Sequence, residues 1–362
     1  MEKKNKITIK KTTANKKVQE YFITLAGIIL LYVFMKIFLD ITDNNYIVAI
    51  MMAIGINIIA AASLNLATGI LGQLALGHAG FMAIGAYTAA IFSKYLIKNT
   101  DLPDWTVLIL AVMLAGIMAA IFGIAIGIPA LRLRGDYLGI VTLGFGEIIR
   151  ISIYNIKEIG GARPVTGIKN LVGIDEMFIL VVLVMTILYL IIRSRHGRAI
   201  LSIRENEIAA EAVGIPTTFY KIFGFATSAF FAGVAGAALA FNQRLIDPKK
   251  FTFMFSVEIF IIVVLGGMGS LTGTVLAAIL LGVLNEWLHF IDQFRLVIYS
   301  LLLVIMMILR PSGLLGTKEF SLARLVFKLI GKDKANKTKE ALAEGEIQEL
   351  NQQEASQKTD KE

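Results

Sequence analysis

Long apolar stretches separated by short polar or glycine-containing breaks dominate this sequence. A helix needs about 20 apolar residues to cross the hydrocarbon core of a bilayer. On that basis the pattern predicts about ten transmembrane helices in an all-α, polytopic membrane helix bundle. Their approximate ranges are 21–39, 46–68, 77–97, 106–130, 136–156, 177–194, 219–242, 254–270, 272–291 and 295–310.

Two of the breaks contain several glycines and have two possible interpretations. The break at 69–73 and the break at 266–270 can each be a tight turn or an unwound stretch of helix. Small residues also cluster within several spans, notably 123–127 and 232–238. Such clusters allow helices to approach closely in lipid, so they predict tight packing and carry no information about a solute.

Composition confirms the membrane class. The 362 residues are 56% hydrophobic and 17% charged, whereas soluble domains are roughly 45–50% apolar and about 25% charged. A globule of this size could not bury the excess apolar surface in water. The sequence has no cysteine, and its histidines (His78, His196 and His289) are far apart, so we expect neither disulfides nor a metal site.

The positive charge indicates orientation rather than a nucleic-acid partner. Seven lysines lie within the first 17 residues, and the net charge is +8. Basic segments next to apolar spans stay on the cytoplasmic side. With an even number of spans, both termini are then cytoplasmic, and so are the turn at Arg132 and Arg134 and the loop at 195–218.

The two ends of the chain differ from the membrane domain at 21–316. Residues 1–20 form a basic cytoplasmic tail. Apolar positions between 317 and 332 follow a helical spacing with basic residues on the other faces, which predicts an amphipathic helix on the inner membrane surface. Residues 333–362 are polar with few apolar positions, which is typical of a disordered cytoplasmic tail.

One stretch, 131–150, places charges and glycines within an apolar span. If a helix begins near Asp136, Glu147 lies about 16 Å along it, close to the middle of the membrane, and Arg150 shares its face. Intramembrane charges face protein or water and are functional candidates. The pair either locks helices together or lines a translocation pathway. The candidate pathway residues are Asp136, Tyr137, Thr142, Glu147 and Arg150.

A second candidate is the predicted cytoplasmic loop at 195–218. It combines a weak apolar stripe with many charges, and Asn206 and Gly214 supply helix start and stop signals. From these residues alone, a solvated connector and a docking element are equally supported. The residues singled out are Gly197, Arg198, Arg204, Glu205, Glu207, Ala209 and Gly214.

The sequence contains no motif for energy conversion. No GxxxxGK[ST] occurs, so the chain has no phosphate-binding P-loop. No nucleophile and base are paired within the spans, so we do not expect an enzyme. An ion gradient or another subunit must supply the energy. A gradient-driven secondary transporter or channel is therefore the competing class.

Three motifs carry a resemblance to a known family. The segments 132–138 and 140–148 read RLRGDYL and IVTLGFGEI, 263–270 reads VVLGGMGS, and 310–315 reads RPSGLL. With these motifs, the region from about 46 to 316 resembles the branched-chain amino acid permeases of ABC importers, in particular the LivM-like subunits. The motifs are highly specific for the family and less specific for the solute.

The resemblance implies a permease in a bacterial plasma membrane that imports leucine, isoleucine and valine by alternating access. It implies a second homologous permease subunit, two cytoplasmic ATPase subunits that bind ATP and Mg, and an extracytoplasmic substrate-binding protein. It assigns the loop at 195–218 to ATPase docking. The chain itself would carry no cofactor.

One departure from the family pattern concerns the solute. Where the family has a Gly-Gly-Pro-Asn-Gly-type loop, residues 160–168 contain an insertion and an added arginine, Arg163. The loop lies outside the membrane in the predicted topology, so Arg163 is a candidate contact for the binding protein. The change keeps other solutes, such as urea or a different amino acid, as alternatives.

Overall fold

The computed structural model describes residues 23–42, 44–133 and 135–287, with short pieces between 297 and 316. Among these residues, seven helices are long and apolar enough to cross a membrane, and two shorter apolar helices accompany them. The predicted tails at 1–20 and 333–362, the surface helix at 317–332 and half of the span at 295–310 lie outside the described residues.

The chain divides into two compact units, Met1–Asp43 with Phe320–Glu362, and Asn44–Glu319. The described part of the first unit is the helix Ile23–Thr42, which matches the first predicted span and has no buried residue in its apolar window. The second unit holds the remaining helices and every site discussed below.

The second unit is a bundle whose helices follow the predicted spans closely. Its long helices are α2 (Asn45–Asn65), α3 (His78–Asn99), α4 (Asp104–Ala130), α5 (Asp136–Asn155), α6 (Ile174–Arg193) and α9 (Thr217–Gln243). Shorter ones are α7 (Arg195–Glu205), α8 (Glu207–Ala212), α10 (Phe253–Gly266) and α11 (Leu271–Trp287). Most boundaries agree with the predicted ones to within three or four residues, because apolar length determines them.

The helix α9 forms the centre of this unit and packs against α2, α3 and α4. Its small residues permit the contact: a Cβ added at Gly236 would lie 2.0 Å from the Met82 carbonyl oxygen of α3. At Gly233 it would lie 2.6 Å from the Ala119 Cβ of α4. The small-residue cluster at 232–238 is therefore a place where three helices pack closely together.

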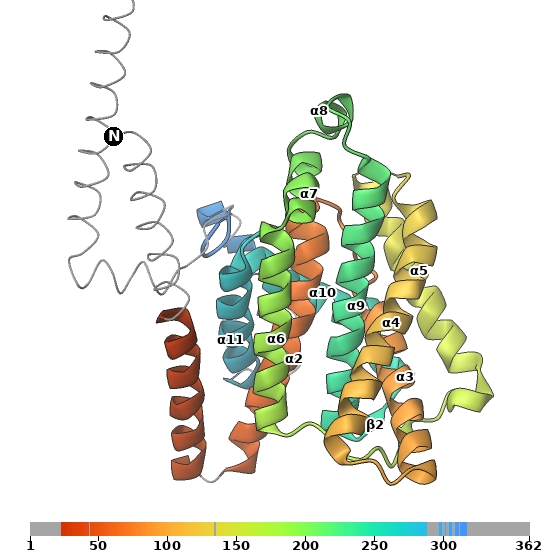
Figure 1. Cartoon of the computed structure of the whole chain (residues 1–362), viewed down its shortest axis with the longest axis vertical. Helices are drawn as coiled ribbons and strands as arrows, with labels where there is room; N and C mark the ends of the chain where they lie inside the picture. Colours follow the sequence, from red (N-terminus) through yellow and green to blue (C-terminus); the bar gives the residue numbers. More distant parts are fainter. Residues whose placement is uncertain are drawn as a thin grey trace, which may run out of the picture. The chain divides into compact units, whose positions relative to one another are not determined.

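The bundle has two distinct ends (Figure 1). One carries α7 and α8; we name it the inner end, because the sequence predicts it to be cytoplasmic. The other, the outer end, carries a two-stranded antiparallel sheet in which β1 (Val165–Thr166) pairs with β2 (Leu245–Ile246). The 3-10 turns η2 (Lys157–Ile159) and η3 (Pro248–Lys250) flank these strands.

Both glycine-containing breaks are departures from regular α-helix. The helix α2 continues as a π-helical turn, η1 (Leu66–Ile70), and an irregular segment at 71–77 follows. The second break is a short loop at 267–270 between α10 and α11. Gly267 and Gly269 adopt φ angles of 107° and 97° there, which other residues rarely tolerate.

Candidate functional site

The helix α10 is too short to cross the membrane alone. Its 14 residues extend about 21 Å, whereas the hydrocarbon core is roughly 30 Å thick. The non-α segment at 247–252, which contains η3, precedes it. Backbone donors and acceptors at such a helix start need partners from the protein, because lipid supplies none.

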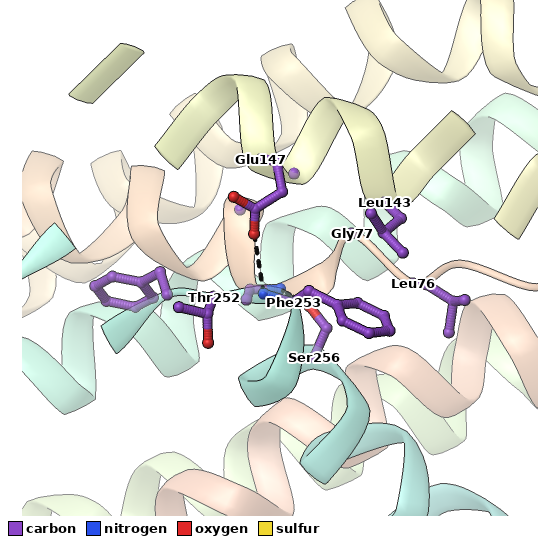
Figure 2. A pocket seen from close by; sticks show the side chains of 11 residues that line it. Leu76, Gly77, Leu143, Glu147, Thr252, Phe253 and Ser256 are labelled. Carbon is purple, nitrogen blue, oxygen red and sulfur yellow. Dashed lines mark hydrogen bonds between the residues drawn. The ribbon is translucent and has the colours of Figure 1, made fainter. Parts of the chain in front are cut away.

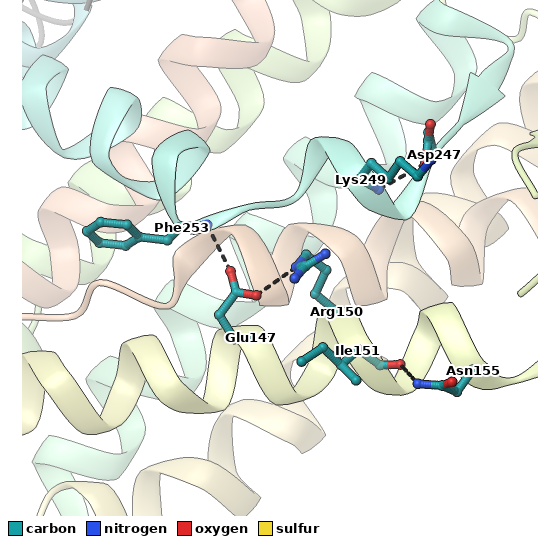
Figure 3. Close-up of polar contacts among 7 residues, drawn as sticks. All are labelled: Glu147, Arg150, Ile151, Asn155, Asp247, Lys249 and Phe253. Carbon is teal, nitrogen blue, oxygen red and sulfur yellow. Dashed lines mark hydrogen bonds and ion pairs between the residues drawn. The ribbon is translucent and has the colours of Figure 1, made fainter. Parts of the chain in front are cut away.

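Glu147 of α5 supplies that partner. One carboxylate oxygen accepts a hydrogen bond from the backbone N–H of Phe253, the first residue of α10, at 3.0 Å. The other pairs with Nε of Arg150 at 2.7 Å (Figure 3). A carboxylate at a helix N-terminus also interacts favourably with the helix dipole. Glu147 therefore joins α5 to the start of α10.

This ion pair is only partly enclosed. The side chains of Glu147 and Arg150 are 28% and 24% exposed. The bond to Phe253 is the kind of contact that a structural lock requires. Partial exposure is also what a pathway-lining pair requires. The structure thus brings Glu147 and Arg150 together as predicted, and a pathway role remains a prediction.

The start of α3 is held at the same junction. The backbone N–H of Leu76 donates to Oγ1 of Thr142 at 3.1 Å, and that of Ala79 donates to Oγ of Ser256 in α10 at 2.9 Å. Thr142 is buried, and its hydroxyl donates to the Gly139 carbonyl at 3.0 Å. Thr142 therefore anchors the irregular segment at 71–77 to α5.

Three glycines allow α3 and α5 to touch through their backbones. A Cβ added at Gly77 would lie 2.0 Å from the Thr142 carbonyl oxygen. At Gly80 it would lie 2.9 Å from Cα of Gly146, and at Gly146 it would lie 3.0 Å from Cα of Gly77. Because the obstacles are backbone atoms, rotamer changes cannot relieve them.

A small hollow lies where α3, α5 and α10 meet (Figure 2). It has room for about one water molecule. An amino acid needs far more space, so passage of such a solute at this place requires the helices to move apart. The lining residues are Leu76, Gly77, Ala79, Gly80, Leu143, Gly146, Glu147, Phe251, Thr252, Phe253 and Ser256.

The other predicted pathway and contact residues lie away from the hollow's lining. Tyr137 is 73% exposed near the inner end of α5. The side chain of Asp136 lies outside the described part of the chain. Arg163 is exposed in the turn before β1, where its backbone N–H donates to the Gly160 carbonyl at 3.2 Å. It is therefore accessible at the outer end.

The predicted docking loop contains two helices, and the second begins and ends at the predicted signals. Oγ of Ser194 accepts from the N–H of Gly197 and caps α7 at 3.2 Å. The side chain of Asn206 accepts from the N–H of Ala209 at 3.0 Å and starts α8. Gly214, with φ of 85°, ends it. Asn206 therefore ends the first helix and caps the second.

The residues of the loop's apolar stripe are buried in α7 and exposed at α8. Ile200 and Ile203 of α7 are buried, whereas Ile208 and Val213 at α8 are 72% and 76% exposed. The carboxylate of Glu207 pairs with the buried Lys221 of α9 at 2.7 Å. The helix α8 is thus fixed to the bundle through Glu207 and presents apolar side chains to its surroundings.

The remaining residues singled out in the loop differ in how far they are buried. Gly197 is buried at the start of α7, whereas Arg198, Glu205 and Ala209 are exposed. Arg204 is half-buried, and its Nη1 donates to the Gly69 carbonyl at 2.6 Å. Its guanidinium group therefore points into the bundle, a direction that the sequence did not predict.

Several residues of these sites were missed by the sequence reading. Asn65, Ser256 and Lys221 are polar, at least nine-tenths buried and hydrogen-bonded or ion-paired between elements. The available signal was their position: each is a polar side chain within or beside an apolar span, as Glu147 is. Among the described residues, no three His, Cys, Asp or Glu side chains are grouped as metal ligands.

Comparisons with known proteins match most of this membrane unit. A family model described as "Branched-chain amino acid transport system / permease component" matches residues 46–310. The chain is 39% identical over 295 residues to the high-affinity branched-chain amino acid transport system permease protein LivM of Salmonella typhimurium, covering 72% of this chain and 68% of the relative.

Two further relatives show a similar pattern. Identity to LivM of Escherichia coli is 40% over 295 residues, with the same coverage. Identity to the permease protein LivH of Salmonella typhimurium is 27% over 272 residues, covering 69% of this chain and 88% of the relative. No solved structure matches the chain significantly.

Proposed function

Because the chain belongs to the family of branched-chain amino acid ABC permeases, we propose that it is the permease subunit of an ATP-driven importer of leucine, isoleucine and valine. The observation that carries this proposal is the similarity to LivM across the membrane unit. The absence of a P-loop in the sequence agrees with energy supplied by other subunits.

The proposed complex contains four kinds of component. A second homologous permease is expected because LivM and LivH, two permease proteins of Salmonella typhimurium, both match this chain. Two cytoplasmic ATPase subunits would bind ATP and Mg. A substrate-binding protein would deliver the solute at the outer end, where Arg163 is an exposed contact candidate. The complex would lie in a bacterial plasma membrane.

The proposed mechanism is alternating access. The exposed Ile208 and Val213 at α8 offer an apolar surface to an ATPase. The solute would pass beside α5, where α3 and α10 begin inside the bundle. Interrupted helices near the middle of the membrane are common sites of solute passage in transporters. The hollow is too small for an amino acid, so opening would require α3 or α10 to move relative to α5.

Reconstitution tests this function. The chain would be co-purified with the second permease and the ATPases, placed in vesicles, and supplied with the binding protein and radiolabelled leucine. We expect uptake that requires ATP and both ATPases and that persists with an uncoupler. Uptake by the chain without ATPases would contradict the proposal, and an uncoupler-sensitive uptake would support the gradient-driven class. Competition by urea or other amino acids would identify a different solute.

A further inference from the structure

The two helix breaks of the bundle lie against each other at its inner end. Asn65, the last residue of α2, is fully buried. Its Nδ2 donates to the Ser270 carbonyl at 2.9 Å and to Oγ1 of Thr274 at 2.8 Å, and its Oδ1 accepts from the N–H of Gly269 at 2.8 Å. One amide side chain thus joins η1 to the loop at 267–270 and to α11.

Arg204 enters this junction from α7. Its Nη1 donates to the carbonyl of Gly69 in η1 at 2.6 Å. A Cβ added at Gly269 would lie 2.8 Å from the same nitrogen, and one at Gly72 would lie 3.1 Å from Cγ of Arg204. The aliphatic part of Arg204 therefore lies on Gly72, and its guanidinium group lies between the two breaks.

The chemistry of the contact suits arginine. The last carbonyls of a helix have no partner within it, and they form the negative end of the helix dipole. Gly69 lies in the last turn before the irregular segment. A guanidinium group carries five donors on a rigid plane and stays charged, which a lysine does not reproduce.

The same arginine is adjacent to the proposed ATPase surface. Only Glu205 and the cap residue Asn206 separate Arg204 from α8, and Glu207 is tied to Lys221 of α9. A displacement of α8 would therefore move Arg204, which contacts both breaks. The first break continues into the segment at 71–77, whose last two residues, Leu76 and Gly77, line the hollow.

We propose that Arg204 is a positioning residue that transmits movement of α7 and α8 to the two helix breaks. This inference rests on the proposed function, because the movement originates in ATPase subunits. It differs from a docking role: Arg204 acts on the bundle, and the partner's contact surface lies on α8. The rest of the contact network, above all Asn65, keeps the breaks together.

The test compares Arg204→Gln with Arg204→Lys in the reconstituted complex. The matched control is Arg193→Gln, an exposed arginine at the end of α6 and outside the loop at 195–218, whose guanidinium carbon lies 4.7 Å from the centre of the Tyr189 ring. We expect Arg204→Gln to co-purify with the ATPases and to hydrolyse ATP. Leucine moved per ATP should fall roughly tenfold or more, since charged hydrogen bonds contribute about 1.5–3 kcal/mol. Arg204→Lys should recover part of this ratio, and Arg193→Gln should resemble the wild type.

Two outcomes would overturn the inference. One is an unchanged leucine-to-ATP ratio in Arg204→Gln. The other is loss of ATPase co-purification with an unchanged ratio in the complexes that remain, which would make Arg204 a docking residue. A wild-type complex without ATP-driven uptake would instead contradict the proposed function, so the two failures are distinguishable.

A second measurement does not depend on the stability of the variants. The chain has no cysteine, so spin labels can be placed at Glu211→Cys on α8 and Leu276→Cys on α11, both exposed positions. If Arg204 holds α8 to the breaks, the distance between the two labels should stay constant when nucleotide is added. The distance from α8 to a third label, placed in the second permease, should change. A nucleotide-dependent change between α8 and α11 would overturn the inference.

Discussion

Glu147 satisfies two donors that lipid would leave unpaired. The N–H of Phe253 and Nε of Arg150 both donate to it. An unsatisfied donor in a membrane interior is costly, so this residue contributes to stability whether or not a solute passes beside it. Substitutions of Glu147 can separate its contribution to stability from a contribution to solute passage.

The first prediction compares Glu147→Gln with Glu147→Leu. Glutamine retains an oxygen acceptor for Phe253, so thermal stability in detergent should change little. Leucine leaves the N–H of Phe253 and Arg150 without an acceptor that lipid could replace, and we expect a loss of about 1–3 kcal/mol in the free energy of unfolding. Retained stability with lost uptake in Glu147→Gln would assign a pathway role. Misassembly of Glu147→Gln would assign the ion pair to structure.

The second prediction concerns backbone contact at the start of α3. Gly77→Ala would place a methyl group 2.0 Å from the Thr142 carbonyl oxygen, so α3 and α5 must separate and the yield of folded protein should fall sharply. The control is Gly144→Ala, because a Cβ at Gly144 meets no atom within 4 Å. Size-exclusion chromatography of both variants checks this. Equal monodisperse yields would contradict the contact.

At the residue scale, the sequence identified Glu147 and Arg150 but not their partner. A charge in an apolar span is visible in any sequence, and the spacing of three predicts their pairing. The bond to Phe253 connects residues that are 106 positions apart. This bond forms only because α10 begins at the same depth in the membrane as Glu147. Hydropathy alone does not predict the depth at which a helix begins. The inward direction of Arg204 was also unpredictable, because its acceptor, the Gly69 carbonyl, lies 135 positions away in the sequence.

At the scale of elements, helix length was predictable and helix continuity was not. Apolar length and the glycine breaks predicted the ends of α2, α3, α5 and α9 to within three residues. The same glycines allowed either a turn or an unwound helix, and the structure has a π turn and a loop. Asn206 was recognised as a start signal, yet it also divides the loop into α7 and α8, because its side chain caps the second helix.

The third prediction follows from this cap. Asn206→Ala removes the acceptor for the N–H of Ala209, at a cost of about 1 kcal/mol. Because α8 has six residues, this loss should fray it. We expect hydrogen exchange of the amides at 209–213 to accelerate roughly fivefold, whereas Asn206→Asp, which keeps a cap, should remain close to the wild type. Equal exchange in both variants would contradict the capping role.

At the scale of the whole molecule, the partly exposed pair on α5 requires a neighbour. Charged groups in a membrane face protein or water rather than lipid. Gly144 lies one turn from Glu147 with open space around it. In the proposed complex, this face of α5 would be covered by the second permease or would border the pathway between the two.

The fourth prediction tests that coverage. A thiol at Gly144→Cys should react with a maleimide when this chain is purified alone, and the rate should fall severalfold on co-purification with the second permease. The control is Ile179→Cys on α6, which is 63% exposed on another helix, and its rate should not change. Protection at both positions would indicate general shielding by detergent or lipid, and protection at neither would place the partner elsewhere.

The short helix α10 has a consequence for biogenesis. A 14-residue helix is a poor independent substrate for membrane insertion, because it cannot cross the bilayer and its first donors need an acceptor. That acceptor, Glu147, is synthesised about a hundred residues earlier. Because α5 is synthesised first, it can be in the membrane before α10 is made. The helix α10 can then insert by packing against α5 rather than by partitioning into lipid alone.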